Sequence, residues 1–112
     1  MRTPANPRFP GRPAKRLTLL MSVHDRVRRT SLEMELLKQA RRAKLAGVTV
    51  FEGDQGFGTS GHVHREHLLS NDRPLAVIII DLPERIDAFL EEVSHLLRGV
   101  VITVDEIETL DL

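Results

Sequence analysis

The residues best suited to binding or catalysis are concentrated in one stretch, EGDQGFGTSGHVHREHLL, which runs from Glu52 to Leu69. Glycine permits positive φ angles and close backbone approach, while histidine can bind a hydrogen-bond partner, a metal or a proton near neutral pH. The stretch therefore predicts a shaped loop with exposed amides that binds a ligand. Its glycines are Gly53, Gly56, Gly58 and Gly61, and its histidines are His62, His64 and His67.

The spacing of the histidines is compatible with a metal site. His62 and His64 project from the same face of an extended chain, and His64 and His67 lie on one side of a helix if the chain turns helical. Either pair can converge on zinc or nickel, with His24 or His95 as a further ligand. Unrelated histidines in a polar loop are the alternative, and both interpretations stay open.

Catalysis has weaker support. The carboxylates lack the spacing of a general acid and base pair, and Ser60 with His62 or His64 has no nucleophile elbow or oxyanion motif around it. We therefore expect no enzymatic activity. The carboxylates concerned are Asp25, Glu52, Asp54 and Glu66.

Composition narrows the class of protein. The 112 residues fit one domain, and the formal net charge of zero gives no global attraction to nucleic acid. Four Phe, with no Trp or Tyr, argue against a stacking platform for single strands. The chain has no Cys and no apolar run long enough to span a bilayer. We expect a cytoplasmic protein that does not bind nucleic acid.

The chain divides into an arm and a domain. Residues 1–14 contain four prolines, three arginines and little to bury, which predicts a disordered basic arm. Residues 15–112 form the predicted domain. Its first half reads as a strand over 15–23, a helix over about 31–46 and a strand over 48–52. Thr30 and Glu33 fit a capping box, and Gly47 fits a helix stop.

The second half repeats this order. The unbroken apolar run 75–80 predicts a strand buried on both faces, and Pro83 predicts the first turn of a helix capped by Asp81 with Glu84. Gly99 ends that helix, a strand follows over 100–104, and the acidic tail beyond it could add a short edge strand. The apolar stripe of this helix is Ile86, Phe89, Leu90, Val93, Leu96 and Leu97. The basic residues late in the first helix, Arg41, Arg42 and Lys44, read as a solvated face.

The order β-α-β-β-α-β predicts an α+β, ferredoxin-like fold with a four-stranded antiparallel sheet. The first and third strands are then central, and both helices cover one face of the sheet. The opposite face would show Thr18, Leu20, Val101 and alternate residues of 75–80 to solvent. A bare apolar face of that size implies a partner surface, and self-association is the simplest way to cover it.

Three runs of the sequence resemble a known family: RLTLLMSVHDR (16–26), KLAGVTVFEGDQGFGTSGHVH (44–64) and LAVIIIDLPERIDAFL (75–90). The family is a group of small bacterial proteins catalogued as a domain of unknown function and described as similar to the PII signalling proteins. The resemblance covers about 15–107, and AGVTVFEGDQGFG is its most specific part. It implies a ferredoxin-like trimer with the sheets facing inward.

The resemblance also implies a function. PII-like proteins bind small effectors, often adenine nucleotides, between subunits, and a loop between the second and third strands reports to a transporter, channel or enzyme. In this sequence that loop is 53–67. The resemblance implies that the loop takes its shape from Gly53, Gly56, Phe57 and Gly58 and that His64 recognises the effector. A pure protein-interaction module without a small ligand is the alternative. Which cofactor or effector binds is not indicated.

One connection departs from the PII pattern. PII proteins have a glycine-rich, lysine-containing phosphate loop between the third strand and the second helix, whereas residues 81–85 here are DLPER. A phosphate would then need the amides of 53–61 together with an arginine. The candidate arginines are Arg26, Arg28, Arg29 and Arg65.

Overall fold

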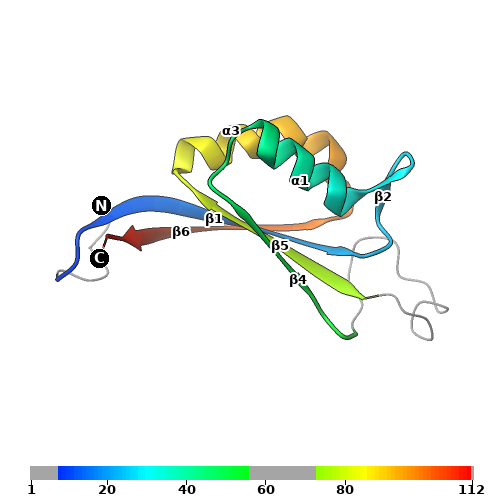
Figure 1. Cartoon of the computed structure of the whole chain (residues 1–112), viewed down its shortest axis with the longest axis horizontal. Helices are drawn as coiled ribbons and strands as arrows, with labels where there is room; N and C mark the ends of the chain where they lie inside the picture. The colour runs from blue at the N-terminus through cyan, green and yellow to red at the C-terminus, as the bar shows by residue number, and fades with distance from the viewer. Residues whose placement is uncertain (1–7, 56–72, 112) are drawn as a thin grey trace.

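The computed structural model describes residues 8–55 and 73–111, which form a four-stranded sheet, a short two-stranded hairpin and two helices (Figure 1). The sheet contains β1 (Gly11–Ser22), β4 (Val48–Glu52), β5 (Pro74–Asp81) and β6 (Val101–Leu110). The hairpin contains β2 (Arg26–Val27) and β3 (Thr30–Ser31), and the helices are α1 (Leu32–Arg42) and α3 (Pro83–Val93), with a 3-10 turn η1 (Ser94–Leu96) after α3.

The strand order β4-β5-β1-β6, with every neighbouring pair antiparallel, confirms the predicted ferredoxin-like topology. The first and third predicted strands, β1 and β5, are the central pair. Both helices lie on the same face of the sheet, as Figure 1 shows. The apolar run of β5 accounts for its central place with a strand on each side. The helices cover only one of its faces, so alternate residues are buried and Ile80 is 39% exposed, which corrects the predicted burial on both faces.

The core lies between the helices and one face of the sheet. In β1 the alternate residues Leu17, Leu19 and Met21 are buried, as strand periodicity requires when one face meets a helix layer. Helix α3 contributes the buried part of its predicted stripe, and Phe89 near its centre is 1% exposed. The other core residues are Leu32, Leu36, Ala40, Leu75, Val77, Ile79, Ile86, Val93 and Leu97.

The opposite face of the sheet has no helix over it, and we call it the open face. Its rows follow from the register: Phe51, Ala76, Leu20 and Val101 lie side by side across the four strands. Phe51 is 58% exposed and Leu20 is 43% exposed. The predicted apolar face is therefore confirmed. Its remaining members are Thr49, Ile78, Thr18 and Thr103 in the next row, then Ile80, Arg16 and Asp105.

The ends of β1 and β6 differ from the prediction. β1 begins at Gly11, which pairs with Leu110, so residues 11–14 belong to the sheet and not to a disordered arm. The tail after residue 104 adds no separate strand, because it continues β6 to Leu110. Pairing between two chain segments far apart in sequence is what extends both strands. Residues 1–7 of the predicted arm lie outside the described residues.

Helix α1 is shorter than predicted. Ser31, not Thr30, is its N-cap, and the Ser31 hydroxyl accepts a hydrogen bond from the Met34 amide at 3.1 Å. The helix ends at Arg42, and Lys44 adopts a left-handed conformation with φ 60°, so the predicted stop at Gly47 is wrong. A left-handed lysine is unfavourable by about 1–2 kcal/mol, which indicates that contacts from elsewhere hold it.

Candidate functional site at the hairpin end of the sheet

Two of the predicted ligand residues, Gly53 and Arg26, lie in the described part of the chain, at the same end of the sheet. Gly53 directly follows β4, and Arg26 starts the hairpin after β1, whose last residue pairs with the first residue of β5. The other predicted ligand and metal residues lie outside the described residues and stay predictions. They are Gly56, Phe57, Gly58, His62, His64 and His67.

Gly53 is required for packing. A Cβ atom at this position would lie 2.8 Å from Cγ of Pro74, closer than side chains tolerate. The Gly53 amide donates to the Pro74 carbonyl oxygen at 2.8 Å. That amide is therefore engaged within the fold, and a contact between Gly53 and a ligand stays a prediction.

The strands on either side of the 53–73 segment are held together at their ends. Glu52 pairs with Leu75 in the sheet, and the Arg73 guanidinium donates to the Glu52 carboxylate across the same position. Together with the Gly53–Pro74 hydrogen bond, these contacts form what we call the loop base: Glu52, Gly53, Arg73 and Pro74. The segment thus starts and returns at adjacent points of a rigid sheet.

The hairpin beside the loop base is organised by Asp25, which is 5% exposed. One of its carboxylate oxygens accepts from the Ser22 amide at 3.0 Å, and its carbonyl oxygen accepts from the Leu32 amide at 2.9 Å. Asp25 therefore joins the end of β1 to the start of α1. Its burial and bonding favour a structural role over the general-acid or general-base role considered above.

Three arginines gather on this hairpin. Arg26 donates from Nη2 to the carbonyl oxygen of Arg29 at 3.1 Å, which closes the hairpin and leaves its other N–H groups at the exposed surface. Arg28 occupies the turn with φ 57°, a conformation that glycine usually takes. The sequence reasoning missed the hairpin, because two-residue strands have no periodicity and Arg-Arg is not a turn signal.

The connection from β5 to α3 has a structural use. Asp81 accepts from the Leu82 amide at 2.7 Å and from the Ala46 amide at 2.8 Å. Arg85 donates to the carbonyl oxygen of Ala43 at 3.3 Å and to that of Lys44. This network holds the left-handed turn after α1 and replaces the predicted side-chain cap, since the N-cap of α3 is Leu82. Pro83 occupies the first turn as predicted.

The described residues contain no group of three or more potential metal ligands. In the same part of the chain, no helix is both long and apolar enough to cross a bilayer. His24 and His95, the proposed extra ligands, are exposed, and lie after β1 and in η1. The histidines His62, His64 and His67 lie outside the described residues, so the predicted metal site stays a prediction.

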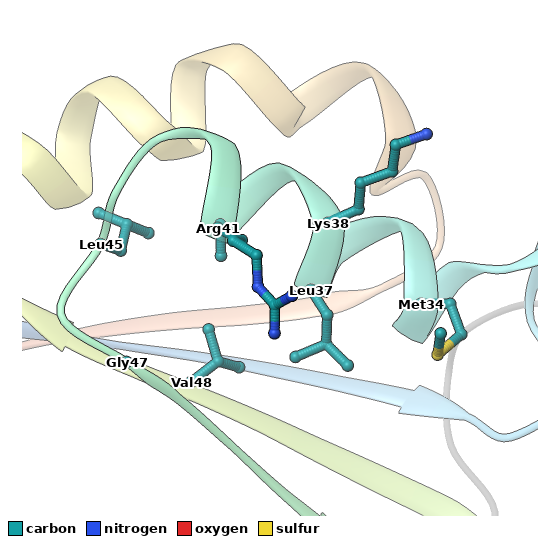
Figure 2. A pocket seen from close by; sticks show the side chains of 8 residues that line it. Met34, Leu37, Lys38, Arg41, Leu45, Gly47 and Val48 are labelled. Atoms are coloured by element: carbon teal, nitrogen blue, oxygen red, sulfur yellow. The ribbon is translucent and has the colours of Figure 1, made fainter.

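A groove of about 490 Å³ lies on the helix side of the sheet, between α1 and β4, away from the loop base. Its walls are apolar side chains of the helix and of the segment leading into β4. Figure 2 shows Arg41 reaching down from α1 toward Val48, beside Leu37, while Lys38 points away from the sheet. Arg41 lines this groove and is exposed, which agrees with the solvated face predicted for it. The lining residues are Met34, Leu37, Lys38, Ala40, Arg41, Leu45, Gly47 and Val48.

Comparison with known families gives a match over most of the chain. Residues 14–109 match the family DUF190, described as uncharacterized ACR, COG1993. A UPF0166 protein from Aquifex aeolicus (strain VF5) is 35% identical over 79 residues, which are 69% of this chain and 74% of that protein.

Solved structures with a similar fold are PII-like proteins. CPII from Thiomonas intermedia K12, a nitrogen regulatory PII-like protein solved with ADP, AMP and bicarbonate, has a TM-score of 0.63 and 18% identity, covering 89% of this chain and 98% of CPII. A putative PII-like signalling protein from Thermus thermophilus has a TM-score of 0.61 and 17% identity, covering 88% of this chain and 91% of the other. At these sequence identities, the structural similarity shows a shared fold and nothing further.

Proposed function

Because this chain belongs to the DUF190 family and has the fold of PII-like proteins, we propose that it is a PII-like regulatory protein of the cytoplasm. It forms a homotrimer through the open face of its sheet and binds a small effector where subunits meet. Effector binding regulates a partner protein, which is a membrane transporter, a channel or an enzyme. The role requires no catalysis by this chain.

The open face is the observation that carries the proposal. Leu20 and Phe51 share one row across the sheet and are largely exposed, with Ile80 exposed two rows away. Burying such a side chain contributes about 1.5–3 kcal/mol. Three inward-facing sheets would bury these side chains against copies of themselves, which is why a homotrimer suits this face.

The effector class with most support is an adenine nucleotide. CPII, which has the same fold, was solved with ADP and AMP. In the present chain Asp81 and Arg85 are engaged with the backbone around α1, so phosphate recognition falls to the hairpin end of the sheet. We propose Arg26 as a phosphate ligand and Gly53 as the residue that shapes the loop base. The remaining proposed ligands are Gly56, Phe57, Gly58 and His64.

Thermal unfolding with adenine nucleotides tests the effector proposal. A ligand at 100 times its Kd stabilises the folded protein by about 2.7 kcal/mol, which raises Tm by several degrees. We expect AMP, ADP or ATP at millimolar concentration to raise Tm, and Arg26→Ala to reduce the rise. Arg42→Ala, which removes an exposed arginine at the far end of α1, is the control. An unchanged Tm with every adenine nucleotide would refute the nucleotide assignment.

Sedimentation velocity tests the trimer separately. We expect a trimer at micromolar concentration, and Leu20→Asp should dissociate it by placing a charge on the open face. Ala88→Asp introduces the same charge at an exposed position of α3 and should leave the trimer intact. A wild-type protein that sediments as a single chain would refute the trimer.

A further inference from the structure

The tip of the β2–β3 hairpin consists of two adjacent arginines, Arg28 and Arg29, and both are exposed. The hairpin is fixed at its root, because Val27 packs against the core and the Arg26 side chain donates to the carbonyl oxygen of Arg29. Figure 1 shows the hairpin standing out from the body beside the start of α1. The hairpin therefore presents two guanidinium groups on a supported, projecting turn.

The turn itself does not require an arginine at position 28. The φ angle of Arg28 is 57°, in the left-handed region that disfavours residues with a Cβ atom and that glycine adopts freely. Backbone strain of this kind is found disproportionately at functional sites. Since glycine would form the same turn with less strain, the charge of Arg28 points to a contact with another molecule.

A third arginine, Arg98, is exposed at the same end of the sheet. It lies between η1 and β6, and β6 begins opposite Leu20, close to the end of β1 from which the hairpin follows. Within the described residues no carboxylate pairs with Arg28, Arg29 or Arg98, whereas the two arginines inside β1 each pair with an aspartate. We call Arg28, Arg29 and Arg98 the basic end.

The layout of the basic end favours a broad anionic surface over an acidic peptide. Its arginines come from two separate segments, the tip of the hairpin and the connection before β6, and none of them lines the groove between α1 and β4. An extended peptide is normally held by a groove or a free strand edge. A lipid surface needs neither, because its anionic headgroups attract exposed arginines at any spacing, and a guanidinium binds phosphate oxygens through paired N–H donors.

The proposed trimer would strengthen such binding. In a cyclic trimer, equivalent residues of the three copies lie at the same level along the symmetry axis. A flat surface perpendicular to the axis that touches one basic end therefore touches all three. Contacts that are weak one by one then act together, because the first contact holds the others at high effective concentration.

We propose that the basic end of the trimer docks on the anionic lipid surface of a membrane, where Arg28, Arg29 and Arg98 contact lipid phosphates. Arg26 is not part of this surface and stays the proposed ligand of the effector. The inference rests on the homotrimer proposed above. It also narrows the proposed partner to one that resides in a membrane, which is a transporter or a channel.

Cosedimentation with lipid vesicles tests the docking. We expect the full chain to bind vesicles of phosphatidylcholine mixed with phosphatidylglycerol and not vesicles of phosphatidylcholine alone. Each arginine at an anionic surface strengthens binding about fivefold, so Arg28→Glu/Arg29→Glu should weaken binding by at least about 25-fold. Arg42→Glu/Lys44→Glu is the matched control, because it changes the net charge equally at two exposed residues beyond the other end of α1. The control should bind nearly as the wild type does.

Replacing Arg28 by glycine separates the charge from the fold. Glycine suits a φ angle of 57°, so Arg28→Gly should keep or raise Tm while binding anionic vesicles about fivefold more weakly. Arg28→Lys keeps the charge and should keep most of the binding. An Arg28→Gly variant that binds as strongly as the wild type would remove Arg28 from the contact.

The outcomes separate this inference from the proposed function. A wild-type trimer that ignores anionic vesicles, or an equal loss of binding in Arg28→Glu/Arg29→Glu and in the control, would overturn the docking and leave the trimer and its effector in place. Binding of polyglutamate without binding of vesicles would assign the basic end to an acidic protein and would also overturn it. A wild-type protein that sediments as a single chain would overturn both proposals.

Discussion

Replacing Gly53 by alanine should destabilise the protein, although alanine usually stabilises a chain. Alanine in place of glycine lowers the entropy of the unfolded chain and gains about 0.4–1 kcal/mol where the backbone tolerates it. At position 53 the new Cβ would lie 2.8 Å from Cγ of Pro74, an atom of a stiff ring that cannot rotate away. Such overpacking costs about 1–3 kcal/mol. The structure therefore predicts a net loss of stability.

Gly47→Ala is a matched control, because a Cβ at Gly47 would meet nothing within 4 Å. Both variants lower the entropy of the unfolded chain by a similar amount. The difference between their free energies of unfolding therefore reports the contact with Pro74. We expect Gly53→Ala to be less stable than Gly47→Ala by about 1–3 kcal/mol. In urea, a difference of about 2 kcal/mol moves the midpoint by about 1 M.

The assay is equilibrium urea unfolding followed by circular dichroism, at one fixed protein concentration because an assembling protein unfolds in a concentration-dependent way. The double variant Gly53→Ala/Pro74→Ala removes the ring and should recover much of the lost stability. Equal midpoints for Gly53→Ala and Gly47→Ala would refute the reasoning, as would a double variant that is no more stable than Gly53→Ala.

Two further predictions concern local contacts of the fold, and a third concerns the predicted metal site. Ser31→Ala should lower the free energy of unfolding by about 1 kcal/mol, because it removes the N-cap of α1. Thr30→Ala should leave it nearly unchanged in the same urea assay. A larger loss for Thr30→Ala than for Ser31→Ala would instead support the capping box predicted from the sequence. Asp81→Ala should cost about 1–3 kcal/mol, because two backbone amides lose their acceptor, and an unchanged unfolding midpoint would contradict this. If the loop histidines bind zinc or nickel, calorimetric titration should show stoichiometric binding that disappears in His62→Ala/His64→Ala, and metal retained by that variant would exclude both histidines.

The architecture could be predicted because the strongest signals are periodic. The alternation of Leu17, Leu19 and Met21 indicates which face of β1 is buried, and the apolar run 75–80 indicates that β5 is a central strand. The ends of helices and strands were less predictable where contacts with residues far away in the sequence determine them. Lys44 ends the turn after α1 because Arg85 binds its carbonyl oxygen, a contact between residues far apart in the sequence.

The candidate site was predicted only in part, for physical reasons. The sequence singles out Gly53 as a residue that shapes the loop, but its contact with Pro74 depends on strand register, which the sequence does not display. Arg41 was predicted to be solvated because helix periodicity places it off the buried stripe, and it is exposed; that it also lines a groove depends on the position of β4, which the sequence does not show. The arginine hairpin gave no periodic signal at all.

The loop base also has a consequence for engineering and for divergence within the family. Since the strand ends on either side of residues 56–72 are already fastened to each other through the Gly53–Pro74 hydrogen bond and the Arg73–Glu52 ion pair, the cost of closing the chain there is small and grows only slowly with length. Replacing residues 56–72 with a short turn or a longer insert is therefore expected to change the stability of the sheet only slightly. New specificities can then arise at this position without the core having to adapt.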